Sequence, residues 1–128
     1  MHRILLIDDD EAVRSATKIL LDAKGFEAVA VECGKSGIDA IKAGAFDLVM
    51  VDLFMPGMNG LETTKAIRQI NTSVPIIAVS GFMFGGPTPE MPHFEDMAIE
   101  AGATAVLYKP FRPNTLAHAV QKAIDEAA

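Results

Sequence analysis

Four short runs of consecutive apolar residues recur along the chain, and they limit its fold more than any other feature of the sequence. They cover residues 4–7, 48–51, 76–79 and 105–108. A run without polar alternation is typical of a β-strand that is buried on both faces, as in a parallel sheet covered by helices. Residues 26–31 are a fifth, weaker candidate. Because Glu27 interrupts their apolar pattern, we expect this strand at an edge of the sheet.

The segments between these runs have helical periodicity. Apolar residues recur at helical spacing in the first and last segments, at Val13, Ala16, Leu20 and Ala23 and at Leu116, Val120, Ala123 and Ile124. Such stripes predict helices that cover a sheet face. Residues 60–70 are predicted as the third helix. Glycines mark the ends of the first, second and fourth helices and a proline suits the first turn of the last, at Gly25, Gly44, Gly102 and Pro113.

Strands that alternate with helices five times predict right-handed crossovers and a parallel sheet with helices on both faces. The fold class is therefore α/β, a doubly wound five-stranded sheet with the flavodoxin-like strand order 2-1-3-4-5. In this order the ligand crevice lies beyond the carboxyl ends of the first and third strands. A chain of 128 residues suits one domain, so we expect a single domain over residues 1–128.

One segment does not fit the alternation. Residues 81–94 contain a Gly-Gly pair and three prolines, which predict a long loop rather than a helix. The fourth helix is then expected to begin only near Glu95. Its expected buried residues are Phe94, Met97, Ala98 and Ala101.

Composition excludes several classes of protein. The formal net charge of −6 makes direct binding to nucleic acid a poor expectation, because the phosphate backbone attracts basic surfaces. The single cysteine, Cys33, cannot form an internal disulfide, and no Cys/His cluster suits zinc. The apolar run near the N-terminus is too short for a signal peptide or a membrane span, so we expect a cytoplasmic protein without membrane contact.

Carboxylates follow the two strands whose ends the topology brings together. The first strand is followed by Asp8, Asp9 and Asp10, and the third ends at Asp52. A lone aspartate is usually a surface residue, but several at adjacent strand ends repel one another unless a cation compensates. Hard oxygen ligands of this kind suit magnesium, or manganese in its place.

The fourth strand ends at Ser80 and the fifth is followed by Lys109. Taken singly, the serine suits a turn and the lysine a solvated surface. Together with the carboxylates they form a set that can receive a phosphoryl group, with a nucleophile, metal ligands and two groups that hold phosphoryl oxygens.

With these residues the chain closely resembles the receiver domain of two-component response regulators, and the match covers nearly its whole length. The motifs are the Asp8-Asp9 pair, Asp52 within VDLFMPGMNG, Ser80, and Lys109-Pro110-Phe111. Each string is weak alone. Their order on successive strand ends is highly specific.

The resemblance implies a phosphoryl-accepting signalling switch. Asp52 would accept a phosphoryl group from a histidine kinase or a histidine phosphotransfer protein and later lose it to water. Asp9, Asp52 and the backbone carbonyl of Phe54 would bind magnesium, with Asp8 acting directly or through water. Beyond its own phosphoryl transfer and dephosphorylation, such a domain is not an enzyme.

The remaining roles implied by the resemblance belong to Lys109, which would pair with Asp52 or its phosphate, and to Ser80, which would hydrogen-bond a phosphoryl oxygen. The Lys109-Pro110 peptide bond is expected to be cis. We expect phosphorylation to alter the region between the fourth strand and the fourth helix and so to change binding to a downstream protein. No effector module is expected after Pro110, so the output passes to another protein unless the chain is a fragment.

Two positions depart from the family or stay open. Val106 stands where receivers commonly have a tyrosine or phenylalanine, and Tyr108 lies two residues further along the same strand face, without being assigned that role. Phosphorylation is then expected to act on residues 81–94, whose apolar residues either pack back onto the sheet or form a partner surface. Phe54 either shields the acyl phosphate from water or simply packs.

Three alternative functions remain. A haloacid-dehalogenase-like phosphatase also has Asp-x-Asp after its first strand, but it needs an acidic group after the lysine, and only Asp125 and Glu126 follow Lys109. A flavodoxin-like flavin carrier needs Ser, Thr or Gly donors where this chain has carboxylates, which repel phosphate. The third alternative is a receiver that acts unphosphorylated as an adaptor.

Overall fold

A parallel five-stranded sheet forms the centre of the molecule in a computed structural model that describes residues 1–53, 59–80, 94–109 and 111–128. The strand order is β2-β1-β3-β4-β5. The strands are β1 (Arg3–Ile7), β2 (Glu27–Val31), β3 (Leu48–Asp52), β4 (Ile76–Ser80) and β5 (Ala105–Tyr108). The predicted fold class, strand order and edge position of β2 are confirmed.

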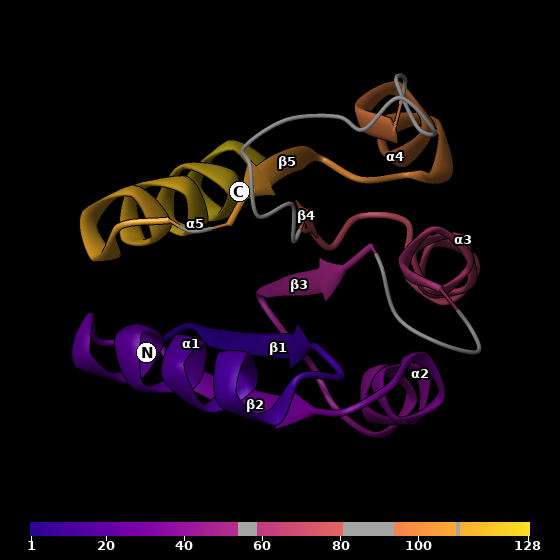
Figure 1. Ribbon diagram of the computed structural model, residues 1–128. Helices are drawn as coiled ribbons and strands as arrows, with labels where there is room; N and C mark the ends of the chain where they lie inside the picture. The colour runs from indigo at the N-terminus through magenta and orange to yellow at the C-terminus, as the bar shows by residue number, and fades with distance from the viewer. Residues whose placement is uncertain (54–58, 81–93, 110) are drawn as a thin grey trace.

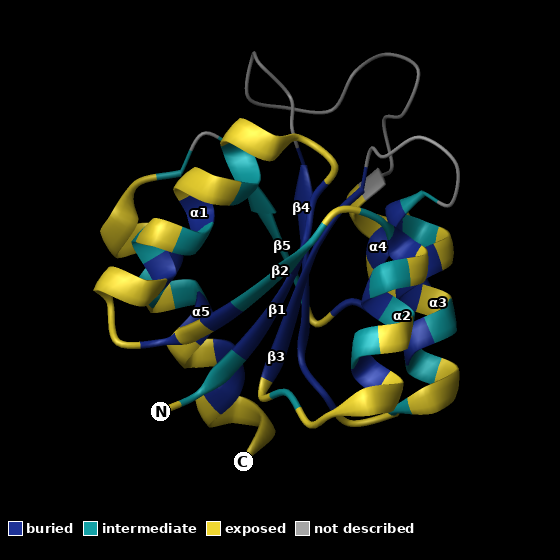
Figure 2. Ribbon diagram, turned by 90° about the horizontal axis from the view of Figure 1, so that it is seen from below, coloured by how far each residue is buried: buried dark blue, intermediate teal, exposed yellow. Residues whose placement is uncertain are grey.

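Helices cover both faces of the sheet (Figure 1). They are α1 (Glu11–Ala23), α2 (Gly34–Ala43), α3 (Gly60–Ile70), α4 (Phe94–Ala101) and α5 (Pro113–Ala127). Figure 2 shows α1 and α5 on one side of the buried strands and α2, α3 and α4 on the other. Within the described residues, no helix has the length and apolar character needed to cross a membrane.

The apolar runs are continuous because each strand contributes to a core on both faces. In β1, Ile4 and Leu6 pack into the cluster below α1 and α5, whereas Leu5 and Ile7 pack into the cluster below α2 and α3. All four side chains are buried. Successive residues of a strand point to opposite faces, so a sheet between two helical layers needs an apolar residue at every position.

Two helix faces differ from the prediction. In α1 the buried residues are Thr17 and Leu21, and the predicted Ala16 and Ala23 are exposed. In α4, Ala98 and Ala101 are buried as predicted, but Met97 is 42% exposed. The Phe94 side chain lies outside the described part. In α1 the predicted Leu20 still packs against the core while partly buried, and the small alanines, which gain little from burial, face solvent.

Short polar side chains cap the starts of α1 and α3, and Gly25 follows α1 as the sequence predicts. Asp10 caps α1 by accepting a hydrogen bond from the Val13 backbone N–H at 3.0 Å. Asn59 does the same for α3 through the Glu62 N–H at 2.9 Å. After α1, Gly25 has a φ of 89°, a left-handed conformation that glycine adopts without steric cost.

Gly60 allows α3 to begin directly against the end of β3. Its backbone N–H donates to the Leu53 carbonyl at 3.1 Å. A Cβ atom at this position would collide with the backbone carbonyl of Asp52 and the Cα of Leu53. The absence of a side chain therefore fixes how closely the helix approaches the strand end that carries Asp52.

We expect Gly60→Ala to lower the free energy of unfolding by about 1 to 3 kcal/mol, because the added methyl meets backbone atoms that cannot move aside. Urea unfolding followed by circular dichroism measures this change. The control is Gly44→Ala, whose Cβ would lie 3.6 Å from the flexible Arg3 side chain and should change stability by less than about 0.5 kcal/mol. Equal stability of the two variants would contradict the prediction.

Candidate functional site

The carboxyl ends of the strands bring four polar side chains to one edge of the sheet. Asp8 follows β1, Asp52 and Ser80 end β3 and β4, and Lys109 follows β5. Three of them are almost fully buried, with 2% exposure at Asp8, 7% at Asp52 and 0% at Ser80. Polar residues so rarely reach this degree of burial without a specific partner that this edge is the candidate site.

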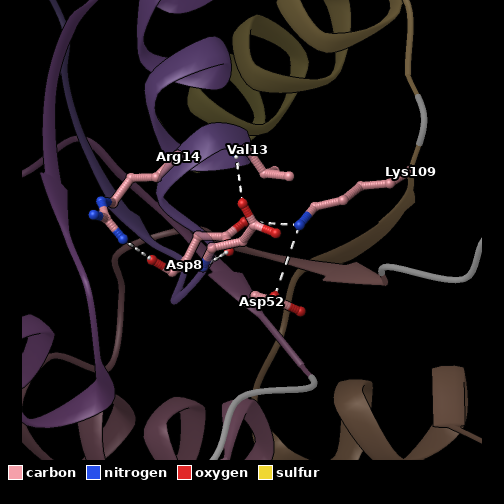
Figure 3. A network of polar contacts seen from close by, with 6 residues as sticks. Asp8, Val13, Arg14, Asp52 and Lys109 are labelled. Atoms are coloured by element: carbon pink, nitrogen blue, oxygen red, sulfur yellow. Dashed lines mark hydrogen bonds and ion pairs between the residues drawn. The ribbon is translucent and has the colours of Figure 1, made fainter.

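The Lys109 ammonium lies between two of the buried carboxylates (Figure 3). Its Nζ is 2.7 Å from Oδ2 of Asp8 and 3.7 Å from Oδ2 of Asp52. The other Asp8 oxygen, Oδ1, accepts a hydrogen bond from the Asp10 backbone N–H at 3.0 Å. Both oxygens of the most buried carboxylate are thus engaged, which satisfies the requirement that a buried charge be paired and hydrogen-bonded.

A third carboxylate completes an oxygen cluster that fits a metal ion. One carboxylate oxygen from each of Asp8, Asp9 and Asp52 lies within 4.8 Å of the others. Asp9 is exposed, so its carboxylate is open to an incoming ion, whereas both Asp8 oxygens already accept hydrogen bonds. Carboxylate oxygens at this density fit a hard divalent cation such as magnesium.

The charge balance of the cluster also favours a cation. Three carboxylates face one ammonium, and two of the carboxylates are buried. Uncompensated like charges in a poorly solvated site are costly. A bound divalent ion would remove this excess of negative charge.

Ser80 is the one buried side chain among the described residues whose polar atom makes no hydrogen bond there. Its backbone carbonyl accepts a hydrogen bond from the Lys109 N–H at 2.8 Å. The preceding residue, Val79, is the register partner of Asp52 on the neighbouring strand. The Ser80 hydroxyl is therefore a buried donor with unused capacity beside the strand end that carries Asp52.

Some predicted features lie outside the described residues. They are the Phe54 carbonyl, the Lys109-Pro110 peptide bond and residues 81–93 of the predicted loop. Asp10, the third residue of the acidic string, caps α1 and is not part of the oxygen cluster.

Tyr108 makes a contact that the sequence analysis did not predict. Its hydroxyl donates a hydrogen bond of 2.6 Å to Oε2 of Glu95, in the first turn of α4. Its ring packs with Val106 against a cluster that includes Ala98 of α4. The hydrogen bond to the Glu95 carboxylate and, to a smaller extent, burial raise the pKa of Tyr108 to about 12. The signal in the sequence was strand alternation, which puts residues 106 and 108 on one face.

Comparison with known proteins identifies the family. The sequence pattern of the response regulator receiver domain matches residues 4–121. The chain belongs to the response regulator receiver domain family. Proteins of this family act as signalling switches and bind magnesium at an acidic pocket, and the carboxylate cluster of this receiver domain has the corresponding composition.

Relatives of this receiver domain include both short and long proteins. It is 34% identical over 125 residues to the chemotaxis protein CheY of Bacillus subtilis, covering 97% of this chain and 98% of CheY. It is 34% identical over 125 residues to the sensor protein GacS of Pseudomonas syringae, covering 94% of this chain but 13% of GacS. It spans 57% of the transcriptional regulatory protein FixJ of Bradyrhizobium diazoefficiens at 32% identity and 97% coverage of this chain.

Among solved structures, the receiver domain resembles a CheY-like receiver domain protein from Methanospirillum hungatei. The TM-score is 0.88 at 28% identity, with 99% of this chain and 96% of that chain covered. The chemotaxis protein CheY4 of Vibrio cholerae gives a TM-score of 0.85 at 28% identity, with coverage of 96% and 98%. Both likenesses agree with the observed strand order.

Replacement of Lys109 tests how much its ammonium stabilises the fold by compensating the buried carboxylates. We expect Lys109→Gln to lower the free energy of unfolding by about 1 to 3 kcal/mol, because Asp8 and Asp52 lose the ammonium between them. Magnesium should restore part of this loss. Urea unfolding with and without magnesium measures both effects. Lys122→Gln, at an exposed position of α5, is the control. It should change neither the free energy of unfolding nor the effect of magnesium on it. Wild-type stability in the Lys109 variant would contradict the prediction.

The Tyr108 contact has a direct spectroscopic test. The chain has one tyrosine and no tryptophan, so the near-ultraviolet absorbance of tyrosinate reports this side chain alone. We expect a pKa of about 12 in the wild type and a pKa closer to the ordinary value of 10.0 in Glu95→Gln, because the carboxylate no longer favours the protonated phenol. Circular dichroism at each pH verifies that the protein stays folded.

The control for this titration is Glu100→Gln, which removes the same charge from α4 at an exposed position. It should leave the Tyr108 pKa at the wild-type value. A pKa near 10 in the wild-type protein while it is still folded would disprove the contact.

Proposed function

We propose that this receiver domain is a phosphoryl-accepting switch, with Asp52 as the acceptor and a histidine kinase or histidine phosphotransfer protein as the donor. The observation that carries the proposal is the position of Lys109 Nζ, 2.7 Å from Asp8 and 3.7 Å from Asp52. It offers a positive charge to a group added at Asp52. We propose that the receiver domain extends over residues 1–128.

The transfer is an exchange of bonds at phosphorus. A carboxylate oxygen of Asp52 attacks the phosphorus of a phosphorylated histidine, an O–P bond forms, and the N–P bond to the imidazole breaks. The imidazole nitrogen then takes up a proton. Hydrolysis then ends the signal. Water attacks the phosphorus and the O–P bond to Asp52 breaks, which regenerates the carboxylate and releases inorganic phosphate.

Several groups at the site suit the negative charge that phosphorylation adds. When bound, magnesium supplies positive charge to phosphoryl oxygens. Asp8, Asp9 and Asp52, with the backbone carbonyl of Phe54, are the proposed ligands, and Asp8 acts directly or through water. Because both Asp8 oxygens already accept hydrogen bonds, the route through water is favoured.

Ser80 is proposed to donate its hydroxyl to a phosphoryl oxygen. Its side chain is fully buried and its Oγ bonds to no group among the described residues, so a new acceptor nearby would satisfy it. Movement of Ser80 would reach β5 directly, because its carbonyl accepts the Lys109 N–H and its register partner is Tyr108. Tyr108 in turn contacts Glu95 of α4.

We propose that phosphorylation alters the region between β4 and α4 and thereby changes binding to a downstream protein. The contacts from Ser80 through Tyr108 to Glu95 support this output. The likeness to a sensor protein and to a transcriptional regulatory protein supports a sensor kinase system as its setting. The cluster of carboxylates does not favour a flavin phosphate, and no specific observation favours a phosphatase.

The test is incubation with acetyl phosphate and magnesium. We expect one phosphoryl group per chain by intact-mass spectrometry, stable in acid and labile in alkali, as is typical of an acyl phosphate. Asp52→Asn should abolish the adduct, because an amide oxygen is a poor nucleophile, and so should removal of magnesium with EDTA.

The matched control is Asp39→Asn, an exposed aspartate of α2 that should be labelled like the wild type. Labelling that persists in Asp52→Asn would assign the acceptor to another residue. A wild-type protein that takes up no phosphoryl group from acetyl phosphate or a phosphorylated histidine phosphotransfer protein would favour the unphosphorylated adaptor instead.

A further inference from the structure

Arg14, in the second turn of α1, forms a hydrogen bond with the main chain of the acidic turn, residues 8–10. Its Nη1 donates a hydrogen bond of 2.8 Å to the backbone carbonyl of Asp8. Figure 3 shows its guanidinium on the opposite side of Asp8 from Lys109. Arg14 is half-buried and lines a pocket of about 270 Å³ together with residues from β2 and the start of α2. It is therefore not part of the oxygen cluster itself.

The Asp8 carbonyl belongs to the peptide group that joins Asp8 to Asp9. A peptide group is planar, so a hydrogen bond that fixes its oxygen also fixes its nitrogen and the start of the next residue. Asp9 depends on this control more than its neighbours do. Its exposed side chain makes no hydrogen bond or ion pair within the described part of the chain, whereas Asp8 is held by Asp10 and Lys109.

We propose that Arg14 is a positioning residue that orients the Asp8–Asp9 peptide so that the Asp9 carboxylate meets the metal ion. The inference rests on the proposed function, because Asp9 must be a magnesium ligand for its orientation to matter. Groups that orient metal ligands through hydrogen bonds strongly influence metal affinity. Among the described residues, Arg14 is the side chain that bonds the main chain of this turn between its two aspartates.

A purely electrostatic role for Arg14 predicts the opposite outcome. A guanidinium near the site repels a divalent cation, so its removal would tighten magnesium binding. The positioning role predicts weaker binding, because the Asp8–Asp9 peptide is then free to rotate. The sign of the change therefore separates the two effects.

The experiment is calorimetric titration of the folded protein with magnesium chloride alone. We expect Arg14→Ala to raise the magnesium Kd about tenfold. Arg14→Lys, which keeps an N–H donor on a long side chain, should recover most of the affinity. Lys18→Ala is the control, because it removes a positive charge from α1 whose ammonium pairs with Asp22 away from the site. The magnesium Kd of Lys18→Ala should equal that of the wild type.

A second measurement separates positioning from general damage to the fold. In acetyl phosphate reactions the magnesium concentration for half-maximal phosphorylation should rise about tenfold in Arg14→Ala, in proportion to its Kd, while the rate at saturating magnesium is retained. A destabilised fold would instead lower the amount of active protein at every magnesium concentration, and thermal unfolding of each variant tests for it.

The outcomes distinguish the two levels of the argument. If the wild type binds no magnesium, the proposed function fails. If the wild type binds magnesium and Arg14→Ala binds it equally well or more tightly, the positioning role is overturned while the proposed function stands. If Arg14→Ala does not fold, the comparison of Arg14→Lys with Arg14→Gln decides, since a Kd that is the same in both and equal to the wild type overturns the role.

Discussion

The contact between the Lys109 ammonium and the buried carboxylates of Asp8 and Asp52 is the interaction on which the site depends. Neither carboxylate could be buried at the sheet edge without an opposite charge, and one ammonium does not balance three acidic groups. The site therefore has a built-in excess of negative charge. This excess explains why a divalent cation fits there, and it is the reason why we propose that phosphorylation of Asp52 requires that cation.

The contacts that join the site to α1 differ from those that join it to α4. Toward α1, Arg14 and Asp10 hold the main chain and the carboxylate of the acidic turn, which stabilises the geometry of potential metal ligands. Toward α4, Ser80 is joined through β5 to Tyr108 and so to Glu95. One side thus suits ion binding, and the other suits transmission of a change at Asp52 to a helix surface.

Sequence patterns predicted the strands and the buried face of α5 well, and the faces of α1 and α4 less well. Residues 4–7 of β1 and every residue of β3 and β4 are buried in a core cluster or at the site, so the apolar runs were unambiguous. In α1 the stripe included Ala16 and Ala23, but a methyl group gains little by burial, and the helix instead buries Thr17 and Leu21. Tyr108 was placed on the correct strand face, yet its partner Glu95 lies on a separate element, which no local pattern could supply.

The sequence by itself determined the fold class, the strand order and which strand ends carry acidic, hydroxyl and ammonium groups, because hydrophobic periodicity and the topology of parallel sheets act through local spacing. Only the tertiary structure decided which oxygen faces which nitrogen. Lys109 lies 101 residues from Asp8 along the chain, and the 2.7 Å between their side chains depends on how β1, β3, β4 and β5 pair across the sheet. The Arg14 bond to a backbone carbonyl has no sequence signal, because any residue could supply that oxygen.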